Sequence, residues 1–314
     1  MTMETQTTVT VQRLEANLNH VIRGKAGVVR LVMTALLAGG HALLEDVPGT
    51  GKTTLAKALA RSIDGVFHRI QFTPDLLPAD ITGSSVYRPH DGTFEFREGP
   101  VFANVLLADE INRTSPRTQS ALLEVMNEKQ VSVEGRQRVL PEPFFVIATQ
   151  NPSDFHGTYP LPESQLDRFA VCVTLGYPEL VDELEIIYSR SERDPLDELT
   201  TVATCDDILA LQEEVRRVKV ERTVTEYALR LVEATRNDPR VRLPISTRGS
   251  LILYRCAQAH AYLAERDYVL PEDIRTLVPP TLAHRISLHT KARYGGILPQ
   301  HVLEEILEAV PVPR

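Results

Sequence analysis

The stretch DVPGTGKTT, residues 46–54, lies between a short apolar segment, HALLE (41–45), and a helical pattern, LAKALARSI (55–63). Its last residues, Gly-Lys-Thr at 51–53, match the end of the phosphate-binding pattern G-x-x-x-x-G-K-[ST]. The first glycine of that pattern is replaced by Asp46. Because a glycine-rich turn between a strand and a helix is the context that the motif requires, the stretch predicts a phosphate-binding loop in an α/β fold.

The residue types of this loop suit a nucleotide phosphate. We expect the backbone N–H groups from Gly49 to Thr53 to surround the β-phosphate at the positive end of the following helix. We expect Lys52 to reach the β- and γ-phosphate oxygens and the hydroxyl of Thr53 to ligate Mg²⁺. The predicted nucleotide-binding residues of the loop are Pro48, Gly49, Thr50, Gly51, Lys52, Thr53 and Thr54.

Asp46 departs from the motif at the point where the strand leaves for the loop. A glycine at this point eases a backbone bend and binds no phosphate through a side chain. An aspartate adopts unusual backbone angles more readily than most residues do. We therefore predict that the Asp46 carboxylate points away from the phosphate cradle and that nucleotide binding survives.

Apolar strand segments alternate with helical patterns through the first half of the chain. This alternation is typical of a parallel sheet that is covered by helices on both faces, and it predicts a five-stranded P-loop α/β core. The five predicted strand segments are residues 41–45, 66–72, 104–112, 144–151 and 169–177.

Two turn signals interrupt this alternation. Asp91-Gly92 and Glu134-Gly135 each lie between arms with strand character, which predicts two inserted hairpins at about residues 80–100 and 130–143.

Three regions follow from the change in pattern along the chain. We expect residues 1–188 to form the α/β nucleotide-binding domain, residues 189–204 to form a polar linker and residues 205–314 to form a small all-α lid domain.

Polar residues follow two of the buried strands. Asp109 and Glu110 end the segment NVLLADEIN, and Asn151 ends FFVIATQN. Open α/β sheets bind ligands at the carboxyl ends of their strands, so Asp109 is a candidate for Mg²⁺ binding and Glu110 for polarising the attacking water. Asn151 could orient the same water. The alternatives without a catalytic role are that Asp109 and Glu110 are solvated acids of a loop and that Asn151 is an asparagine at a turn.

The composition, the N-terminal residues and the apolar segments indicate which partners and which compartment to expect. The 314-residue chain has a formal net charge of −8, whereas broad contact with nucleic-acid phosphates needs a surplus of Lys and Arg. Its three cysteines lie far apart, without the spacing of a disulfide framework or zinc site. The first ten residues lack a signal-peptide pattern, and the apolar run at 28–44 is interrupted by Arg30 and two glycines. We expect a cytoplasmic protein with no membrane span.

Taken together, these blocks resemble the MoxR family of AAA+ ATPases. The resemblance spans about residues 21–177 and weakens through the helical region. It is carried by DVPGTGKT, by FREGPVFANVLLADEINRTSPRTQSALLEVM, by FFVIATQN and by LPESQLDRF, of which the second and the last are more specific than the P-loop. The two hairpins are similar to the helix-2 insert and the pre-sensor hairpin of that AAA+ branch.

The resemblance implies roles for residues that match the family's motifs. Lys52 and Thr53 match the Walker A lysine and threonine, and Asp109 and Glu110 match Walker B. Asn151 matches sensor 1. We also expect Gln71, at the tip of the second predicted strand, to contact Glu110 and sense nucleotide.

Two arginines also match motifs of the family. Arg168, in LDRF, matches the arginine finger, which in AAA+ rings reaches the γ-phosphate of the neighbouring subunit; the alternative for it is a surface ion pair with Asp167. Arg248, in PISTRGS, matches sensor 2 and could act in cis or in trans. The residues that resemble the segment lining the adenine pocket are Val21, Ile22 and Gly24.

The implied function is Mg²⁺-dependent hydrolysis of ATP to ADP and phosphate in a homo-oligomeric ring, expected to be a hexamer. From the family we expect chaperone-like remodelling or maturation of a protein partner that carries a von Willebrand A domain, including metal-cofactor insertion. Two alternatives stay open. One is a nucleic-acid-associated AAA+ motor or loader, which the acidic balance disfavours. The other is a nucleotide-controlled binding switch with little turnover.

Overall fold

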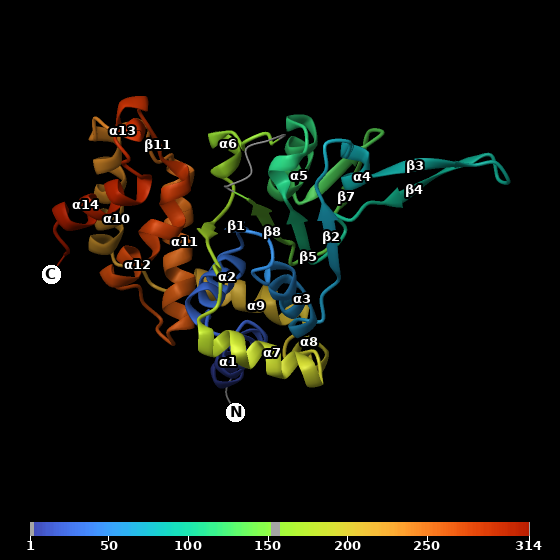
Figure 1. The fold of residues 1–314 in the computed structure, drawn as a ribbon, viewed down its shortest axis with the longest axis horizontal. Helices are drawn as coiled ribbons and strands as arrows, with labels where there is room; N and C mark the ends of the chain where they lie inside the picture. Colours follow the sequence, from blue (N-terminus) through green and yellow to red (C-terminus); the bar gives the residue numbers. More distant parts are fainter. Residues whose placement is uncertain (1–2, 152–157, 314) are drawn as a thin grey trace. The chain divides into compact units, whose positions relative to one another are not determined.

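The computed structural model describes residues 3–151 and 158–313 (Figure 1). By their internal contacts these residues form two compact units, which interleave along the sequence. Of the described residues, the first unit contains those within 1–29, 43–161 and 174–209, and the second contains those within 30–42, 162–173 and 210–314. Three elements contribute residues to both units: α2 (Ala26–Leu37), β1 (Ala42–Glu45) and α9 (Cys205–Arg216).

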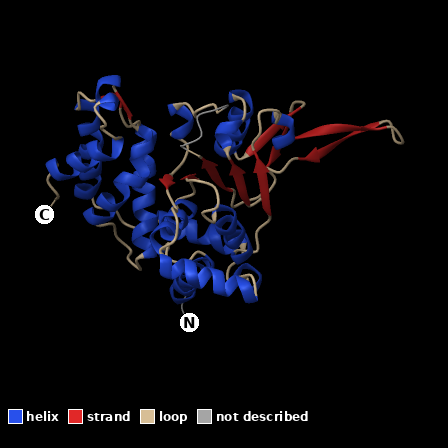
Figure 2. Cartoon of the chain, in the orientation of Figure 1, coloured by secondary structure: helices blue, strands red, loops and turns tan. Residues whose placement is uncertain are grey.

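The central sheet has five strands in the order β2-β5-β8-β1-β9. Figure 2 draws strands in red and helices in blue. The ladders between β2 and β5 and between β5 and β8 are parallel. The predicted five-stranded parallel sheet is therefore confirmed. Besides β1, its strands are β2 (Phe67–Gln71), β5 (Val105–Asp109), β8 (Phe145–Gln150) and β9 (Val171–Val173).

The two inner strands β5 and β8 explain why the sequence shows continuous apolar runs. All five residues of β5 are buried, and so are the first five of β8. A strand that is covered on both faces gains from apolar side chains at every position, in contrast to the alternation of a half-buried strand. The apolar run of β5 ends at Asp109, so the first carboxylate stands where the strand leaves the core.

The helices of the first unit begin where the sequence provides caps and proline. α5 begins at Pro116, and the hydroxyl of Ser115 accepts a hydrogen bond from the backbone N–H of Thr118 at 3.4 Å. Proline costs nothing at a first helical position, because its missing N–H would have no partner there. The helices of this unit, besides the shared ones, are α1 (Met3–Val21), α3 (Lys52–Ser62), α4 (Pro78–Thr82), the 3₁₀ turn η1 (Ile111–Arg113), α5 (Pro116–Glu128), α7 (Leu180–Glu192) and α8 (Pro195–Glu198).

Both predicted hairpins are present. Strands β3 (Gly83–Arg88) and β4 (Thr93–Glu98) pair antiparallel around the predicted Asp-Gly turn. Strands β6 (Gln130–Val133) and β7 (Arg136–Val139) do the same around Glu-Gly. Figure 1 shows that the β3–β4 hairpin extends away from the sheet.

The second unit is mainly helical, which confirms the predicted helical lid. The structure adds one feature that the sequence did not reveal, a two-stranded antiparallel sheet of β10 (Val241–Leu243) and β11 (Ser287–Leu288). Strands of three and two residues are too short to show an alternating pattern. The helical elements are α6 (Glu163–Leu166), α10 (Arg222–Asn237), α11 (Thr247–Leu263), α12 (Pro271–Leu282), η2 (Ala283–Arg285), α13 (Thr290–Tyr294) and α14 (Pro299–Ala309).

Hydrogen bonds connect the segment 189–204 to helices α1 and α3 within the first unit. The side chain of Asn17 donates to the Thr200 carbonyl at 2.8 Å, and the Val202 N–H donates to the Ser62 carbonyl at 2.9 Å. The division into domains at the predicted boundaries stays a prediction.

No helix in either described part of the chain, 3–151 or 158–313, is long and apolar enough to cross a membrane.

Candidate active site

The glycine-rich loop connects β1 to α3, as its sequence context predicts. Gly49 and Gly51 have φ values of 88° and 93°, in the left-handed region that favours glycine. Helix α3 begins at Lys52, directly after this turn. The N-terminal N–H groups of a helix have no partner within the helix, and together with the helix dipole they favour a bound anion.

Lys52 folds back over this loop. Its Nζ donates hydrogen bonds to the carbonyl of Val47 at 2.6 Å and to the carbonyl of Asp46 at 3.3 Å. The ammonium group therefore lies at the loop itself, where phosphate oxygens would bind. An anion at the loop can take over the hydrogen bonds that these two carbonyls now accept.

The carboxylate of Asp46 is engaged by the chain beyond β9. Its Oδ2 accepts hydrogen bonds from the backbone N–H groups of Leu175 at 2.6 Å and Gly176 at 3.0 Å, and the residue is 5% exposed. The predicted direction of this side chain is confirmed by these bonds. Asp46 still borders the cavity, where its carbonyl faces Lys52. Its side chain connects the C-terminal end of β1 to residues 175–176.

Asp109 lies at the end of β5 and carries two strong hydrogen bonds. Its Oδ1 accepts from the hydroxyl of Thr149 at 2.6 Å, and its Oδ2 accepts from Nη2 of Arg69 at 2.6 Å. The Thr149 hydroxyl also accepts from the backbone N–H of Glu110 at 2.9 Å. Thr149 thus fixes both acids of the pair from the neighbouring strand.

Glu110 has an unusual backbone and two side-chain partners. Its φ of 56° is rare for a residue other than glycine, and such outliers cluster at functional sites. Its Oε2 accepts from Nε2 of Gln71 at 2.8 Å and lies 3.4 Å from Nε of Arg113. The predicted contact between Gln71 and Glu110 is confirmed, whereas its role in sensing nucleotide stays a prediction.

A cavity of about 360 Å³ brings the loop and the strand ends together. Thr50 and the three predicted adenine-pocket residues do not line it. The sequence-predicted residues that line it are Pro48, Gly49, Gly51, Lys52, Thr53, Thr54, Gln71, Asp109, Glu110 and Asn151.

Three further residues of the cavity, Arg69, Thr149 and Gln150, are not predicted by the sequence. A lone arginine on a predicted strand carries no motif. Its signal is the strand register: Gln71 of β2 pairs with Asp109 of β5, so Arg69, two positions earlier, points to the same face. Thr149 and Gln150 belong to the TQN sequence, of which only the asparagine matches a functional motif.

The donor set suits Mg²⁺ that is shared with phosphate. Thr53 and Asp109 offer a hydroxyl and a carboxylate, the hard oxygen ligands that Mg²⁺ prefers. The described residues contain no group of three or more His, Cys, Asp or Glu side chains that could hold a metal ion. Mg²⁺ in nucleotide sites is commonly held by one or two protein ligands plus phosphate oxygens, so the residues fit this ion. Arg69 shows that the Asp109 carboxylate already attracts a cation.

The segment predicted to line the adenine pocket adjoins the loop. Val21 and Ile22 are each 7% exposed. The Cδ1 atom of Ile22 lies 3.9 Å from the position that a Cβ on Gly51 would take. Gly24 follows with a φ of 71°. Contact with the base stays a prediction.

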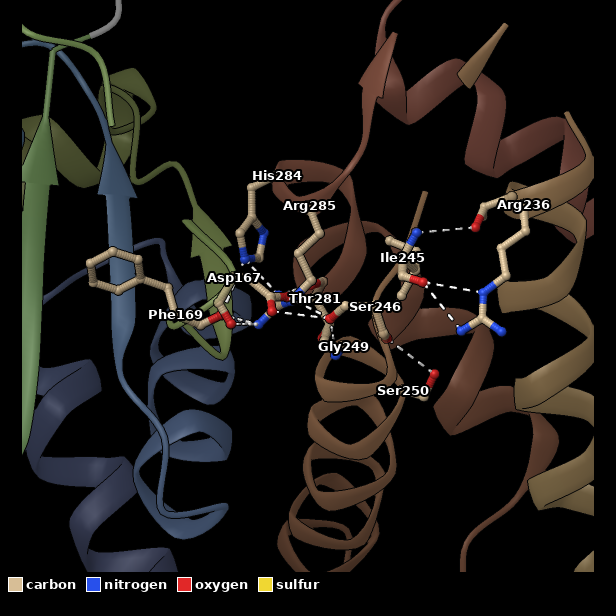
Figure 3. Close-up of polar contacts among 11 residues, drawn as sticks. Asp167, Phe169, Arg236, Ile245, Ser246, Gly249, Ser250, Thr281, His284 and Arg285 are labelled. Atoms are coloured by element: carbon tan, nitrogen blue, oxygen red, sulfur yellow. Dashed lines mark hydrogen bonds and ion pairs between the residues drawn. The ribbon is translucent and has the colours of Figure 1, made fainter. Parts of the chain in front are cut away.

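Arg168 and Arg248 belong to the second unit, and their catalytic roles stay predictions. Asp167, which directly precedes Arg168, contacts two residues of the helical region. Asp167 Oδ1 pairs with Nε of Arg285 at 3.1 Å, and its Oδ2 accepts from the hydroxyl of Ser246 at 3.0 Å (Figure 3).

Two family models match this chain. The model described as "ATPase family associated with various cellular activities (AAA)" matches residues 41–171, and the model described as "AAA lid domain" matches residues 233–306. The first match contains the loop and both acids, and the second contains α11, α12 and η2.

Relatives are similar over nearly the whole chain. Chaperone MoxR1 of Mycobacterium tuberculosis is 41% identical, over 97% of this chain and 83% of its own length. YeaC of Bacillus subtilis, whose function is uncharacterised, is 50% identical, over 95% of this chain and 93% of its own. A crystal structure of a candidate ATPase from Cytophaga hutchinsonii has a TM-score of 0.92 and 38% identity, over 99% of this chain and 97% of that chain.

Proposed function

This chain belongs to the MoxR family of AAA+ ATPases, and from this premise we propose that it hydrolyses ATP to ADP and phosphate in a Mg²⁺-dependent reaction. One observation carries the proposal. A single cavity collects a glycine-rich loop at a helix N-terminus, two acids at the end of a buried strand and a polar residue at the end of the next strand. Phosphoryl transfer relies mainly on positioning and on stabilising charge, and these groups provide both.

Each group has a distinct task in the proposed reaction. Lys52 places a positive charge at the β- and γ-phosphate oxygens. Glu110 accepts a hydrogen bond from the attacking water and makes its oxygen a better nucleophile, while Asn151 orients the same water. Thr53 and Asp109 would hold Mg²⁺, which when bound neutralises charge on the phosphate oxygens.

We further propose that the active enzyme is a homo-oligomeric ring, a hexamer, with Arg168 acting on the γ-phosphate of a neighbouring subunit. An arginine supplied in trans accelerates phosphoryl transfer by about 10³–10⁵-fold in other nucleotide hydrolases. Arg248 would contribute a second cation. Such a ring ties turnover to assembly, which a remodelling machine requires.

The biological task we propose is chaperone-like remodelling or maturation of a protein partner with a von Willebrand A domain, such as the insertion of a metal cofactor. The similarity to proteins named Chaperone MoxR1 and Protein MoxR supports a chaperone-like role. A nucleic-acid motor is disfavoured by the formal net charge of −8.

Capture of the partner tests this task. The Glu110→Gln variant keeps the shape of the side chain, loses its charge and is expected to hold ATP in a long-lived state. With ATP present, it should retain a von Willebrand A domain protein from its own cell extract at least about tenfold above wild type. Lys52→Ala, which should not bind ATP, is the matched control.

Retention of the same protein by Lys52→Ala would show that binding is independent of nucleotide and would contradict the proposal. Enrichment of nucleic acid by Glu110→Gln, without a protein of this class, would favour the motor alternative instead.

A further inference from the structure

We propose that Arg285 is a positioning residue that fixes the segment carrying Arg168 and the first turn of the helix carrying Arg248 in one arrangement. The inference rests on the proposed function, because it concerns how the two arginines are presented to nucleotide. All of its contacts lie within the second compact unit, and Figure 3 shows them.

Arg285 holds the residues on both sides of Arg168. Its Nε lies 3.1 Å from Oδ1 of Asp167, and its Nη2 donates to the carbonyls of Asp167, at 3.3 Å, and Phe169. Asp167 and Phe169 directly precede and follow Arg168. The guanidinium therefore fixes the backbone on each side of the arginine, and so limits the directions that the Arg168 side chain can take.

The remaining guanidinium nitrogen of Arg285 is held by the helix before it. Nη1 donates to the carbonyl of Thr281, near the end of α12. The Arg285 side chain is 1% exposed. A guanidinium has five N–H donors in a rigid fork, so a buried arginine with acceptors on several sides has one orientation. Arg285 thus connects the C-terminal end of α12 to residues 167–169 through hydrogen bonds in a fixed geometry.

Asp167 extends the same network to α11. The Ser246 hydroxyl donates to Oδ2 of Asp167 at 3.0 Å. The same hydroxyl accepts from the backbone N–H of Gly249 at 3.1 Å, which makes Ser246 the N-cap of α11. Arg248 lies in the turn that this cap closes. A change at Asp167 would therefore disturb both candidate arginines.

Gly249 leaves room for the side chain of Arg285. A Cβ at Gly249 would lie 3.1 Å from Cδ of Arg285 and 2.7 Å from Cγ2 of Ile245. The first turn of α11 can therefore approach the stem of Arg285 only because the residue there is glycine. The close approach ties the position of α11 to the guanidinium independently of the hydrogen bonds.

His284 completes the cluster without adding charge. Its Nε2 lies 3.1 Å from the carbonyl of Phe169 and 2.6 Å from Nη1 of Arg285. Burial and the neighbouring Arg285 charge hold the pKa of His284 well below its ordinary value, so the ring is neutral near neutral pH. Asp167 and Arg285 therefore face each other as a single pair of opposite charges.

The geometry matters because an arginine finger acts by placing its charge accurately. Displacing a catalytic group by about 1 Å can cost about 10²-fold in rate. Arg285→Lys keeps the charge but loses the planar fork, so the segment 167–169 would be held at fewer points. We expect it to lower kcat at least about tenfold while the dissociation constant for ATP changes by less than about threefold.

Mixed rings test whether this loss arises from the finger. A Lys52→Ala subunit cannot use its own site but carries an intact segment around Arg168. Mixing it with Arg285→Lys subunits should restore turnover at least about fivefold, because the intact finger is supplied in trans. Mixing Lys52→Ala with Arg168→Ala should do the same.

A matched control comes from another ion pair of the same unit. Arg240 contacts Asp238 and Glu305, each at 2.7 Å, and no part of the proposed network includes it. Arg240→Lys should keep kcat within about twofold of wild type. If Arg285→Lys does not fold, Ser246→Ala replaces it: it should lower kcat about threefold, and Ser246→Thr should restore the value by restoring the cap and the hydroxyl donor.

Two results would overturn the inference: an unchanged kcat in Arg285→Lys (or, if that variant does not fold, in Ser246→Ala), or no rescue in the mixture when Arg168→Ala is rescued. If neither mixture is rescued, the trans role of Arg168 in the proposed function fails, and the positioning role fails with it.

Discussion

At the scale of single residues, Asp46 shows how a nucleotide-binding loop can depart from its motif. A glycine at this point serves backbone flexibility alone. Here the carboxylate instead accepts hydrogen bonds from two backbone N–H groups that lie 129 and 130 positions further along the chain. Charge-assisted hydrogen bonds to backbone N–H groups are stronger than neutral ones. An aspartate in place of the motif's glycine therefore gives up backbone flexibility and gains hydrogen bonds between two parts of the first unit.

Asp46→Gly should separate this structural role from nucleotide binding. The variant leaves the N–H groups of Leu175 and Gly176 without their acceptor, which should lower the free energy of unfolding by about 1–3 kcal/mol. The dissociation constant for ATP should stay within about tenfold of wild type, because the cradle of residues 49–53 is unchanged. Urea unfolding and a nucleotide-binding titration measure the two quantities. Tightening of ATP binding by about 100-fold or more would show that the carboxylate opposes the phosphate.

The residues of the site differ in how visible they were in the sequence. Asp109 and Glu110 could be predicted because acids rarely end a buried strand without a function. Arg69 and Thr149 could not, because their roles arise from pairing between strands that are far apart in the sequence. The partners of Asp167 show the same limit: Arg285 lies 118 positions away, so no local pattern indicates the pair.

At the scale of elements, the β3–β4 hairpin has an outer part that the fold does not bury. Tyr87 and Phe94 are 51% and 70% exposed, and their ring centroids lie 5.3 Å apart. Nearer the base, Phe96 packs against Phe102 with centroids 6.0 Å apart and lies beneath the guanidinium of Arg138. The base of the hairpin therefore packs against the first unit, whereas the aromatic side chains of its outer part are exposed and available for contact with a partner.

Shortening this hairpin should leave the basal activity intact. Replacing residues 86–95 by Asn-Gly would join Ser85 to Phe96, which already pair in the ladder, through a two-residue turn. Little buried surface is lost, so basal ATP hydrolysis should stay within about twofold of wild type, and the thermal midpoint within about 3 °C. Any stimulation of hydrolysis by a protein partner should be lost. A roughly tenfold fall in basal hydrolysis would instead place the hairpin tip in the catalytic assembly.

The elements themselves could largely be predicted, because each has a local signal. Buried parallel strands appear as apolar runs, both hairpins have a glycine in their turns, and α5 has a cap and a proline. The pair β10–β11 had no such signal, because strands of three and two residues depend on the contacts around them rather than on a period.

At the scale of the whole molecule, the two compact units interleave in a way that the sequence does not reveal. Residues 162–173 lie between parts of the first unit in the sequence but belong to the second unit, together with residues 30–42 and the helical region that begins at residue 210. Arg168 and Arg248, proposed to act on nucleotide, therefore share one unit. In the proposed ring, hydrolysis at one site would depend on the helical unit that supplies the two arginines.

We propose that the cavity between the glycine-rich loop and the ends of β5 and β8 hydrolyses ATP. Turnover and nucleotide binding, both measured for wild type and for Glu110→Gln in the presence of Mg²⁺, test it most directly. We predict that the variant binds ATP within about threefold of wild type but lowers kcat by at least about 100-fold, because it keeps the phosphate cradle and loses the base. Undiminished hydrolysis by Glu110→Gln, or failure of the wild-type protein to hydrolyse ATP with Mg²⁺ under conditions in which it binds ATP, would contradict the account.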